Sequence, residues 1–490
     1  MTPARPIRRL LVANRGEIAV RVIRGCRAAG VSPVGVYSEA DRGARHVRLA
    51  DDAVLLGPAP AAQSYLDAGR VLAAAKKSGC DAVHPGYGFL SENAAFARAV
   101  EEAGLVWVGP PPAAIEAMGL KIPSRERMRA AGIPVVPGKH DLDGAEAVRR
   151  VGLPVVIKAS AGGGGKGMRV VRDAAELPDA LASCRREAEA AFGDGTLYAE
   201  RYLERPRHVE VQVFGDRHGR VVALGERECS LQRRHQKVIE ESPSPAVTPA
   251  LRRRLSEAAV AAAGTVAYVN AGTVEFLLAS DGSFFFLEMN TRLQVEHPVT
   301  EEAFGLDLVA LQLRVAAGEP LPTILPEAPS AHAVEARIYA EDAENGFLPQ
   351  TGRFLAWEEP SGPGIRVDSG VAAGDEVSVH YDPMLAKVVA RGATRDEARR
   401  RLVAALGETV ALGVTTNLSY LRRVLASAPV VAGELDTSLL ERLEIPPVRP
   451  PSEAVFEAAG REFASWGSEA VARSASFPDP FEAGPFRGLR

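Results

Sequence analysis

The chain has few cysteines, no long apolar run and no large excess of charge of either sign. Its 490 residues include four cysteines, none in a Cys-x-x-Cys pair, which argues against a disulfide framework or a zinc site. We expect all four, Cys229 in its charged stretch included, to be structural. The net charge of −4 gives no signal for nucleic acid or an anionic membrane. No run approaches the roughly 18 apolar residues of a membrane span, and the basic N-terminus does not continue into a signal-peptide core. We therefore expect a cytoplasmic protein that binds neither nucleic acid nor membrane.

The first part of the chain alternates short apolar runs with helical patterns. Arg9–Ala13 has the pattern of a strand, and Gly16–Ala29 follows with apolar residues on one helical face. Similar pairs repeat as far as Val106–Val108. This alternation is typical of a doubly wound parallel sheet, which binds ligands at the carboxyl ends of its strands. The turn Ala13–Glu17 lacks the three-glycine dinucleotide fingerprint, so a nicotinamide-dependent enzyme is disfavoured.

The rest of the chain predicts mixed α+β structure. Pro110–Pro112 ends the first unit, and a helical linker around Ser124–Ala131 leads into a small module. Strands at Val155–Ala159 and Met168–Val171 flank a glycine loop there, and hairpins follow. After Ile445 the sequence becomes proline-rich, which predicts a linker or a docking segment.

The glycine loop has the composition of a phosphate-binding loop. Four consecutive glycines, Gly162–Gly165, lie between Lys158 and Lys166. Without a Cβ, their backbone N–H groups can approach a phosphate closely, and the lysines add positive charge. The loop is not a P-loop, because no Ser or Thr follows Lys166. A flexible linker is the alternative, but the position between two strands favours a mobile lid that closes on ATP.

A second pattern, between Thr273 and Asn290, predicts a metal site. Asp281-Gly282 between apolar runs is a strong signal for a two-residue turn. That turn places Glu275 directly opposite Glu288, with Asn290 further along the same face. Opposed carboxylates are destabilising unless a cation lies between them, and these oxygen ligands suit Mg²⁺ or Mn²⁺. The alternative is a pair of solvated strand carboxylates.

Charged residues that could bind a small anion follow this hairpin. Arg292 and Glu296 combine a cation with a carboxylate that can remove a proton. A basic run, 232–237, could contact phosphate and bicarbonate oxygens, or could be a solvated loop.

Taken together, these motifs resemble the biotin carboxylase members of the ATP-grasp family, from Arg8 to about Leu440. The matching segments are Ala13–Ala19, His84–Asn93, the lysine-glycine loop, Arg227–Lys237 and Glu288–Pro298. The resemblance implies an N-terminal doubly wound α/β domain, an α+β ATP-grasp core with a mobile glycine-rich lid, and a C-terminal biotin carboxylase domain. The implied boundaries are 1–118, 119–318 with the lid at about 135–203, and 330–446, followed by a linker or docking tail at 447–490.

The resemblance also implies a role for particular residues. It assigns ATP binding to Lys121, Lys158, Gly163, Gly164, Gly165, Lys166, Glu200, Leu203, His208, Gln232 and His235. It assigns two Mg²⁺ or Mn²⁺ ions to Glu275, Glu288 and Asn290, bicarbonate to Lys237, Arg292, Gln294, Val295 and Glu296, and biotin to Tyr87 and Arg337. Lys237, Arg292, Glu296 and Arg337 would be catalytic, with Glu296 as the base and Arg337 beside the biotin enolate. Asp382 is a further candidate near biotin or phosphate.

The reaction implied is ATP-dependent carboxylation of biotin through carboxyphosphate. The sequence contains no Ala-Met-Lys-Met type biotinylation turn, so biotin is expected on a separate carrier protein, with carboxyltransferase subunits as further partners. A homodimer is also implied. Acetyl-CoA, propionyl-CoA, methylcrotonyl-CoA and pyruvate all remain open as final acceptors.

Two other functions compete with this one. Another ATP-grasp ligase, such as half of a carbamoyl phosphate synthetase, would share the metal hairpin but not the run Arg292–His297 or Arg337. A non-catalytic nucleotide-sensing scaffold would not need every charged position retained. Bicarbonate-dependent ATP cleavage with free biotin separates the scaffold from the enzyme.

Overall fold

The computed structural model describes residues 5–140, 151–159 and 168–447, with a few positions between 453 and 461. The chain divides into two compact units, 1–445 and 446–490. The predicted phosphate loop, with Gly163, Gly164, Gly165 and Lys166, lies outside the described residues. Among the described helices, none is both long and apolar enough to cross a bilayer.

The N-terminal part is the predicted doubly wound parallel sheet. Its strands run in the order β3-β2-β1-β4-β5, with parallel pairing throughout. The strands are β1 (Arg9–Val12), β2 (Ser32–Ser38), β3 (Asp52–Gly57), β4 (Ala82–His84) and β5 (Val106–Trp107), and the helices are α1 (Gly16–Ala28), α2 (Arg45–Leu49), α3 (Ala68–Lys77) and α4 (Ala94–Glu102). The order reverses between β1 and β4, where Asn14 Nδ2 donates to the Tyr87 carbonyl at 2.7 Å. Tyr87 is therefore fixed at the switch point, where such sheets bind ligands.

Two helices, not the single predicted linker, follow the first sheet. They are α5 (Pro112–Gly119) and α6 (Lys121–Ala130), separated by the extended Leu120. Pro112 was interpreted as a breaker, but it occupies the first turn of α5, where a missing N–H costs nothing.

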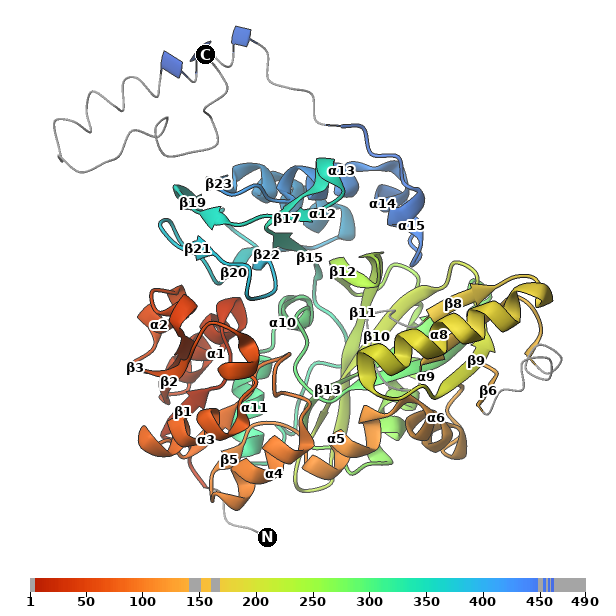
Figure 1. Ribbon diagram of the computed structural model, residues 1–490, viewed down its shortest axis with the longest axis horizontal. Helices are drawn as coiled ribbons and strands as arrows, with labels where there is room; N and C mark the ends of the chain where they lie inside the picture. The colour runs from red at the N-terminus through yellow and green to blue at the C-terminus, as the bar shows by residue number, and fades with distance from the viewer. Residues whose placement is uncertain are drawn as a thin grey trace. The chain divides into compact units, whose positions relative to one another are not determined.

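The predicted lid is a small antiparallel sheet covered by one helix. Its strands are β6 (Gly138–His140), β9 (Leu197–Arg201), β7 (Val155–Ala159) and β8 (Met168–Val171), in that order, and the helix is α8 (Leu177–Phe192). Figure 1 shows α8 beside β8 and β9. Cys184 of α8 is buried with Val155 and Ile157 in the core of this module.

One antiparallel sheet of eight strands connects the predicted ATP-grasp and C-terminal domains. Its order is β14-β13-β10-β11-β12-β15-β22-β20, and β12 adjoins β15 (Figure 1). These strands are β10 (Arg207–Gly215), β11 (Val221–Arg233), β12 (Gln236–Ser242), β13 (Asn270–Leu278), β14 (Phe284–Asn290), β15 (His332–Tyr339), β20 (Ile365–Ser369) and β22 (Met384–Gly392). Because β12 and β15 share hydrogen bonds, side chains from both predicted domains can meet on one face of the sheet.

The remaining elements cover this sheet. The helices are α9 (Pro249–Gly264), α10 (His297–Phe304), α11 (Leu308–Ala316), α12 (Arg395–Glu408), α13 (Leu418–Ala426), α14 (Ala428–Ala432) and α15 (Leu439–Arg442). Three short strand pairs complete the unit: β16 (Glu341–Asp342) with β17 (Leu348–Pro349), β18 (Gly352–Arg353) with β21 (Glu376–Val377), and β19 (Ala356–Glu358) with β23 (Val410–Leu412). One apolar core lies under α9, and another lies under α12 and α13.

The hairpin that carries the predicted metal ligands has a different turn from the one predicted. The Ala279 N–H donates to the Ser283 carbonyl at 2.8 Å, so the turn enclosed by this hydrogen bond has three residues, 280–282, and not the predicted two. This change alone would move Glu288 away from Glu275. A bulge at Leu287 restores the pairing, and Glu275 lies directly opposite Glu288 as predicted. The predicted turn was wrong by one residue, and the predicted pairing is confirmed.

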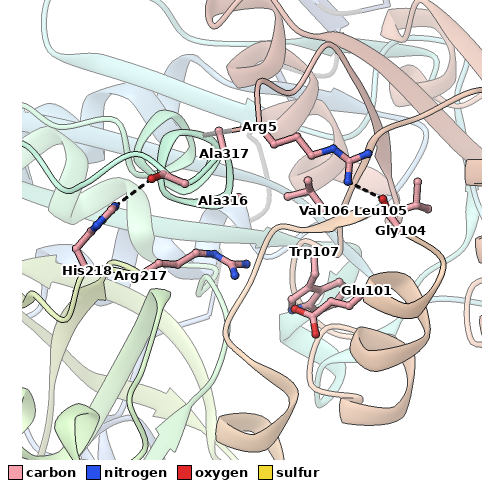
Figure 2. A pocket seen from close by; sticks show the side chains of 11 residues that line it. Arg5, Glu101, Gly104, Leu105, Val106, Trp107, Arg217, His218, Ala316 and Ala317 are labelled. Carbon is pink, nitrogen blue, oxygen red and sulfur yellow. Dashed lines mark hydrogen bonds between the residues drawn. The ribbon is translucent and has the colours of Figure 1, made fainter. Parts of the chain in front are cut away.

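A cavity of about 710 Å³ lies where the N-terminal sheet adjoins the β10–β11 turn and the end of α11. Arg5, Trp107, Arg217 and His218 are among the side chains that line it (Figure 2). None of the predicted site residues lines this cavity.

Gly225 redirects β11 toward the predicted site. Leu224 and Gly225 together oppose Gln212 of β10, which makes a bulge, and Gly225 has a φ of +78°. A Cβ at Gly225 would overlap the ring of Phe304 on α10. The bulge therefore needs glycine for two reasons: the left-handed conformation and the close approach of α10.

We predict that Gly225→Ala destabilises the protein by about 2–4 kcal/mol, because left-handed strain adds to overpacking against Phe304. Gly219→Ala is the matched control, since Gly219 also has a positive φ (+89°) but has open space at its Cβ position. Urea unfolding measures both variants. Equal losses of unfolding free energy would contradict the role assigned to the contact with Phe304.

Candidate active site

Lys237 of β12 lies at the centre of a buried cluster of carboxylates. Its Nζ donates to one oxygen of each of Glu210 (2.6 Å), Glu275 (2.8 Å) and Glu296 (2.6 Å). Burial alone would lower the pKa of this ammonium, but the carboxylates outweigh burial and raise it well above its ordinary value. Lys237 is therefore charged, and it holds together side chains from β10, β13 and the segment before α10.

Glu296, the predicted base, lies between two cations. One oxygen accepts from Lys237, and the other accepts from Arg337 Nη2 at 3.0 Å. Burial favours the protonated form of Glu296, but Lys237 and Arg337 hold its pKa below the ordinary value. Arg337 also contacts Glu240 at 2.5 Å. Glu296 is therefore an ionised carboxylate whose two cationic partners could also bind a small anion.

Arg227 of β11 supports this cluster and was assigned no separate role from the sequence. Its side chain is 0% exposed. It donates to Glu210 (2.5 Å), Gln212 (2.8 Å), Thr273 (3.0 Å), Gln294 (2.9 Å) and Thr300 (2.9 Å). The bulge at Gly225 lets β11 continue through Arg227 to Arg233. An Arg between two Glu residues in an otherwise strand-like run was the available signal.

The predicted metal ligands lie together on β13 and β14. Asn290 Nδ2 donates to Glu275 Oε1 at 2.8 Å, and Glu288 pairs with Glu275 across the ladder. Lys237 and His208 keep the pKa of Glu275 well below its ordinary value although burial opposes this. Enclosure and the neighbouring Glu275 raise the pKa of Glu288, whose side chain is still 39% exposed. Two carboxylates and an amide oxygen, with one carboxylate accessible, fit a hard divalent cation.

His208, Glu210 and Glu275 offer a second group of possible ligands. One ligand atom from each lies within 4.8 Å of the others. His208 Nε2 is 2.8 Å from Glu275 Oε2, and Gln232 Nε2 is 3.4 Å from His208 Nδ1. Three of the predicted ATP and metal residues are therefore in direct contact.

Arg292 is held by the N-terminal domain as well as by the hairpin. Its Nε donates to Glu92 at 2.9 Å and its Nη2 donates to Asn290 Oδ1 at 2.9 Å. Glu92 belongs to the segment His84–Asn93 but was not predicted as a site residue. Gln294 Nε2 donates to Glu275 Oε1 at 2.7 Å, and the Val295 carbonyl accepts from Lys387 at 2.7 Å. Lys237, Gln294 and Glu296 are thus joined through contacts of Lys237 and Glu275, and Arg292 joins them through Asn290. The Val295 carbonyl is bound by Lys387 instead.

The predicted nucleotide lysines lie on the lid and beside it. Lys158 of β7 pairs with Glu200 of β9, and Arg125 contacts the same carboxylate at 2.7 Å. Lys121 Nζ is 4.0 Å from Glu288. His235 has a φ of +65° at the β11–β12 turn, and Leu203 lies half-buried between β9 and β10.

Tyr87 and Asp382 are hydrogen-bonded to residues other than Arg337. The Tyr87 hydroxyl donates to Glu17 of α1. Asp382 is used locally, where its side chain accepts from the Met384 amide at 2.8 Å. Arg337 is therefore the predicted biotin residue that directly contacts the cluster.

All four cysteines are free and buried. Cys229 Sγ lies 3.9 Å from Glu296, and burial raises its thiol pKa well above the ordinary value. The neutral thiol packs against the cluster.

Three family models match the chain. "Biotin carboxylase, N-terminal domain" matches residues 6–115, "Carbamoyl-phosphate synthase L chain, ATP binding domain" matches 121–324, and "Biotin carboxylase C-terminal domain" matches 335–442. A biotin carboxylase of Halalkalibacterium halodurans is 50% identical over 439 residues, covering 88% of this chain and 97% of the relative. The chain belongs to the biotin carboxylase family.

Other relatives are longer proteins. The rat methylcrotonoyl-CoA carboxylase subunit alpha is 51% identical over 90% of this chain, which spans 62% of that protein's length. Among solved structures, the biotin carboxylase–β,γ-ATP complex of Campylobacter jejuni has a TM-score of 0.86 at 41% identity, covering 89% of this chain and 99% of that one. The biotin carboxylase domain of the Hydrogenobacter thermophilus 2-oxoglutarate carboxylase, solved with MgADP and bicarbonate, has a TM-score of 0.85 at 42% identity, covering 89% and 98%.

We predict that Arg227→Lys lowers bicarbonate-dependent ATP cleavage by about 100-fold. A lysine cannot replace the planar set of donors, and each buried acceptor left without its donor costs about 1–3 kcal/mol. Arg220→Lys, at the β10–β11 turn, removes an arginine that donates to the Pro322 carbonyl, and it should leave activity within twofold. Steady-state ADP release measures both. Full activity in Arg227→Lys would contradict the supporting role.

Proposed function

We propose that the chain uses ATP and bicarbonate to carboxylate biotin, giving ADP, phosphate and N-carboxybiotin. The single observation that carries this proposal is the Glu296 carboxylate held between Lys237 and Arg337 beside the Glu275–Glu288 pair. This arrangement provides a base and two cations next to a set of metal ligands. Relatives named biotin carboxylase support it.

The nucleotide would lie between the lid and the eight-stranded sheet. In the proposed domain division, 1–118 is the N-terminal domain, 119–318 is the ATP-grasp domain with its lid at about 135–203, 330–446 is the C-terminal domain and 447–490 is a linker or docking tail. Lys121 and Lys158 would contact phosphates, and the backbone around Glu200 and Leu203 would contact adenine. The Glu200 side chain, already paired with Lys158 and Arg125, would position the phosphate lysine.

Glu275, Glu288 and Asn290 would hold Mg²⁺ or Mn²⁺, which when bound offsets phosphate charge. The chain's own residues supply the rest of the charge balance. Bicarbonate is an anion and must approach the γ-phosphate, so Lys237 and Arg292 would neutralise both groups. Arg292 is kept in place by Glu92 and Asn290.

Proton removal follows from the two cations around Glu296. When bicarbonate enters, Lys237 and Arg337 would share their positive charge with it, and the depressed pKa of Glu296 would rise toward its ordinary value. Glu296 could then accept the bicarbonate proton as the oxygen attacks the γ-phosphorus and ADP leaves. The product is carboxyphosphate.

Biotin would react in the same enclosure. Carboxyphosphate breaks down to CO₂ and phosphate, and the phosphate takes the ureido N–H proton of biotin. The nitrogen then attacks CO₂, while the ureido oxyanion lies against Arg337, whose orientation Glu240 maintains. Tyr87 at the switch point would contact biotin from the N-terminal domain.

The proposed partners are a biotin carboxyl carrier protein and carboxyltransferase subunits, with the chain forming a homodimer. The proposed acceptor is an acyl-CoA, supported by relatives named methylcrotonoyl-CoA carboxylase subunits. The alternative within this class is acetyl-CoA as the acceptor, in an acetyl-CoA carboxylase of fatty acid biosynthesis. Assay of the assembled enzyme with methylcrotonoyl-CoA and with acetyl-CoA distinguishes these two acceptors.

We predict that Glu288→Gln lowers ATP cleavage with bicarbonate and free biotin by about 100-fold or more while the fold is retained, since about 3 kcal/mol of charge stabilisation is lost with the metal ligand. Glu434→Gln, an exposed carboxylate, is the control. ADP release and circular dichroism measure the outcome. Near-normal turnover would refute the metal assignment, and a wild-type chain without bicarbonate-dependent ATP cleavage would refute the function.

We predict that Arg337→Ala reduces carboxylation of free biotin by about 100-fold, the usual effect of losing an oxyanion donor. Its effect on bicarbonate-dependent ATP cleavage without biotin should be smaller. The two rates, measured on one preparation, give the comparison. Equal losses in both reactions would count against the enolate role of Arg337.

A further inference from the structure

The face of the eight-stranded sheet that carries Arg337 belongs to a buried layer of charged side chains. Most of the layer lies beyond the active site described above. Its buried members, from α1, β12, β15, β20, β22, α10 and the segment before α10, are Glu17, Arg21, Glu240, Glu296, Glu301, Glu335, Arg337, Asp368 and Lys387. Buried charges are costly unless each has a partner, so the contacts of each member show what it does.

Lys387 of β22, like Arg337, contacts the bicarbonate segment, residues 292–296. Its side chain is 0% exposed. Nζ donates to the Val295 carbonyl at 2.7 Å and lies 3.2 Å from Glu17 Oε2 and 4.0 Å from Asp368. The strand sequence Leu-Ala-Lys-Val-Val gave no reason to assign this lysine a role.

Lys387 and Arg337 are directly opposed on β22 and β15. Like charges in this position are destabilising, so the pair must be compensated by what each cation binds. Arg337 binds the Glu296 carboxylate, and Lys387 binds the carbonyl of the preceding residue. Arg337 and Lys387, which are neighbours in the sheet, thus bind Glu296 and Val295, which are consecutive in the bicarbonate segment.

We infer that Lys387 is a positioning residue: by holding the Val295 carbonyl, it sets the place of the Glu296 carboxylate between Lys237 and Arg337. The inference rests on the proposed function, in which this segment binds bicarbonate. Lys387 itself contacts no reacting group. Through its hydrogen bond to the Val295 carbonyl, the position of β22 in the sheet determines the position of the Glu296 base.

Glu17 connects this hydrogen bond to the N-terminal domain. One Glu17 oxygen pairs with Lys387, and the other accepts from the Tyr87 hydroxyl at the switch point. A continuous series of contacts therefore runs from Tyr87 through Glu17 and Lys387 to Val295. The segment around Glu296 is fixed from the N-terminal domain as well as from the sheet.

The test compares Lys387→Met, which keeps the length of the side chain but removes its donor, with Asp368→Asn as the matched control. Asp368 lies in the same layer beside Lys387, but its hydrogen bonds and ion pairs go to Arg366, Arg24 and Lys387 and not to Val295. We expect Lys387→Met to raise the KM for bicarbonate at least about tenfold with the KM for ATP within twofold, since a charge-assisted hydrogen bond is lost. Asp368→Asn should leave both KM values within twofold.

Hydrogen–deuterium exchange of residues 291–298 provides a measurement that needs no turnover. Exchange there should rise in Lys387→Met but not in the helix Pro249–Gly264. If Lys387→Met does not fold, Glu17→Gln takes its place, with an expected rise of about threefold in the KM for bicarbonate and faster exchange at 291–298. Effects equal to those of Asp368→Asn in both measurements would overturn the inference.

These results also separate the two proposals. An inactive wild-type chain would refute the proposed function, while the exchange measurement still decides whether Lys387 positions the segment. Normal wild-type activity with unchanged KM values and unchanged exchange in a folded Lys387→Met would refute the inference alone.

Discussion

The contact of the Lys237 ammonium with three carboxylates is the interaction on which the site depends. Glu210, Glu275 and Glu296 come from different segments, and their mutual repulsion in a buried region would separate them without a cation. Arg227 forms a further ion pair with Glu210, and Arg337 forms one with Glu296. The result is a compact group of alternating charges that is stable as it stands. A substrate anion can enter it by replacing existing contacts, and no new charge has to be buried alone.

Strand register determines which of these charges meet. The eight-stranded sheet crosses the boundary between the proposed ATP-grasp and C-terminal domains, so Arg337 of β15 can reach Glu296 beside β12. Two bulges adjust that register: the one at Gly225 brings Arg227 to Glu210, and the one at Leu287 brings Glu288 to Glu275. Bulges near active sites are a common means of re-aiming side chains. Here they place ligands and counter-charges on a shared face.

Much of the fold and the main site residues could be predicted from the sequence, because periodicity and motif order carry that information. The pairing of Glu275 with Glu288 was predicted correctly, but the turn predicted for this hairpin was one residue too short. A bulge at Leu287, which was not predicted, compensates for the longer turn. Arg227, Glu92 and Lys387 received no separate role because their importance comes from strands and loops that are distant in sequence. A sequence pattern indicates which residues are neighbours along the chain, whereas buried charge pairs are determined by tertiary contacts.

The central claim is that the buried cluster around Lys237 is an anion site built around an ionised base. A crystal structure of this protein grown with nucleotide, Mg²⁺ and bicarbonate tests that claim most directly. The account predicts bicarbonate within hydrogen-bonding distance of Lys237 and Glu296, on the side toward Arg337. Bicarbonate bound elsewhere, or Glu296 turned away from both cations in that complex, would contradict it.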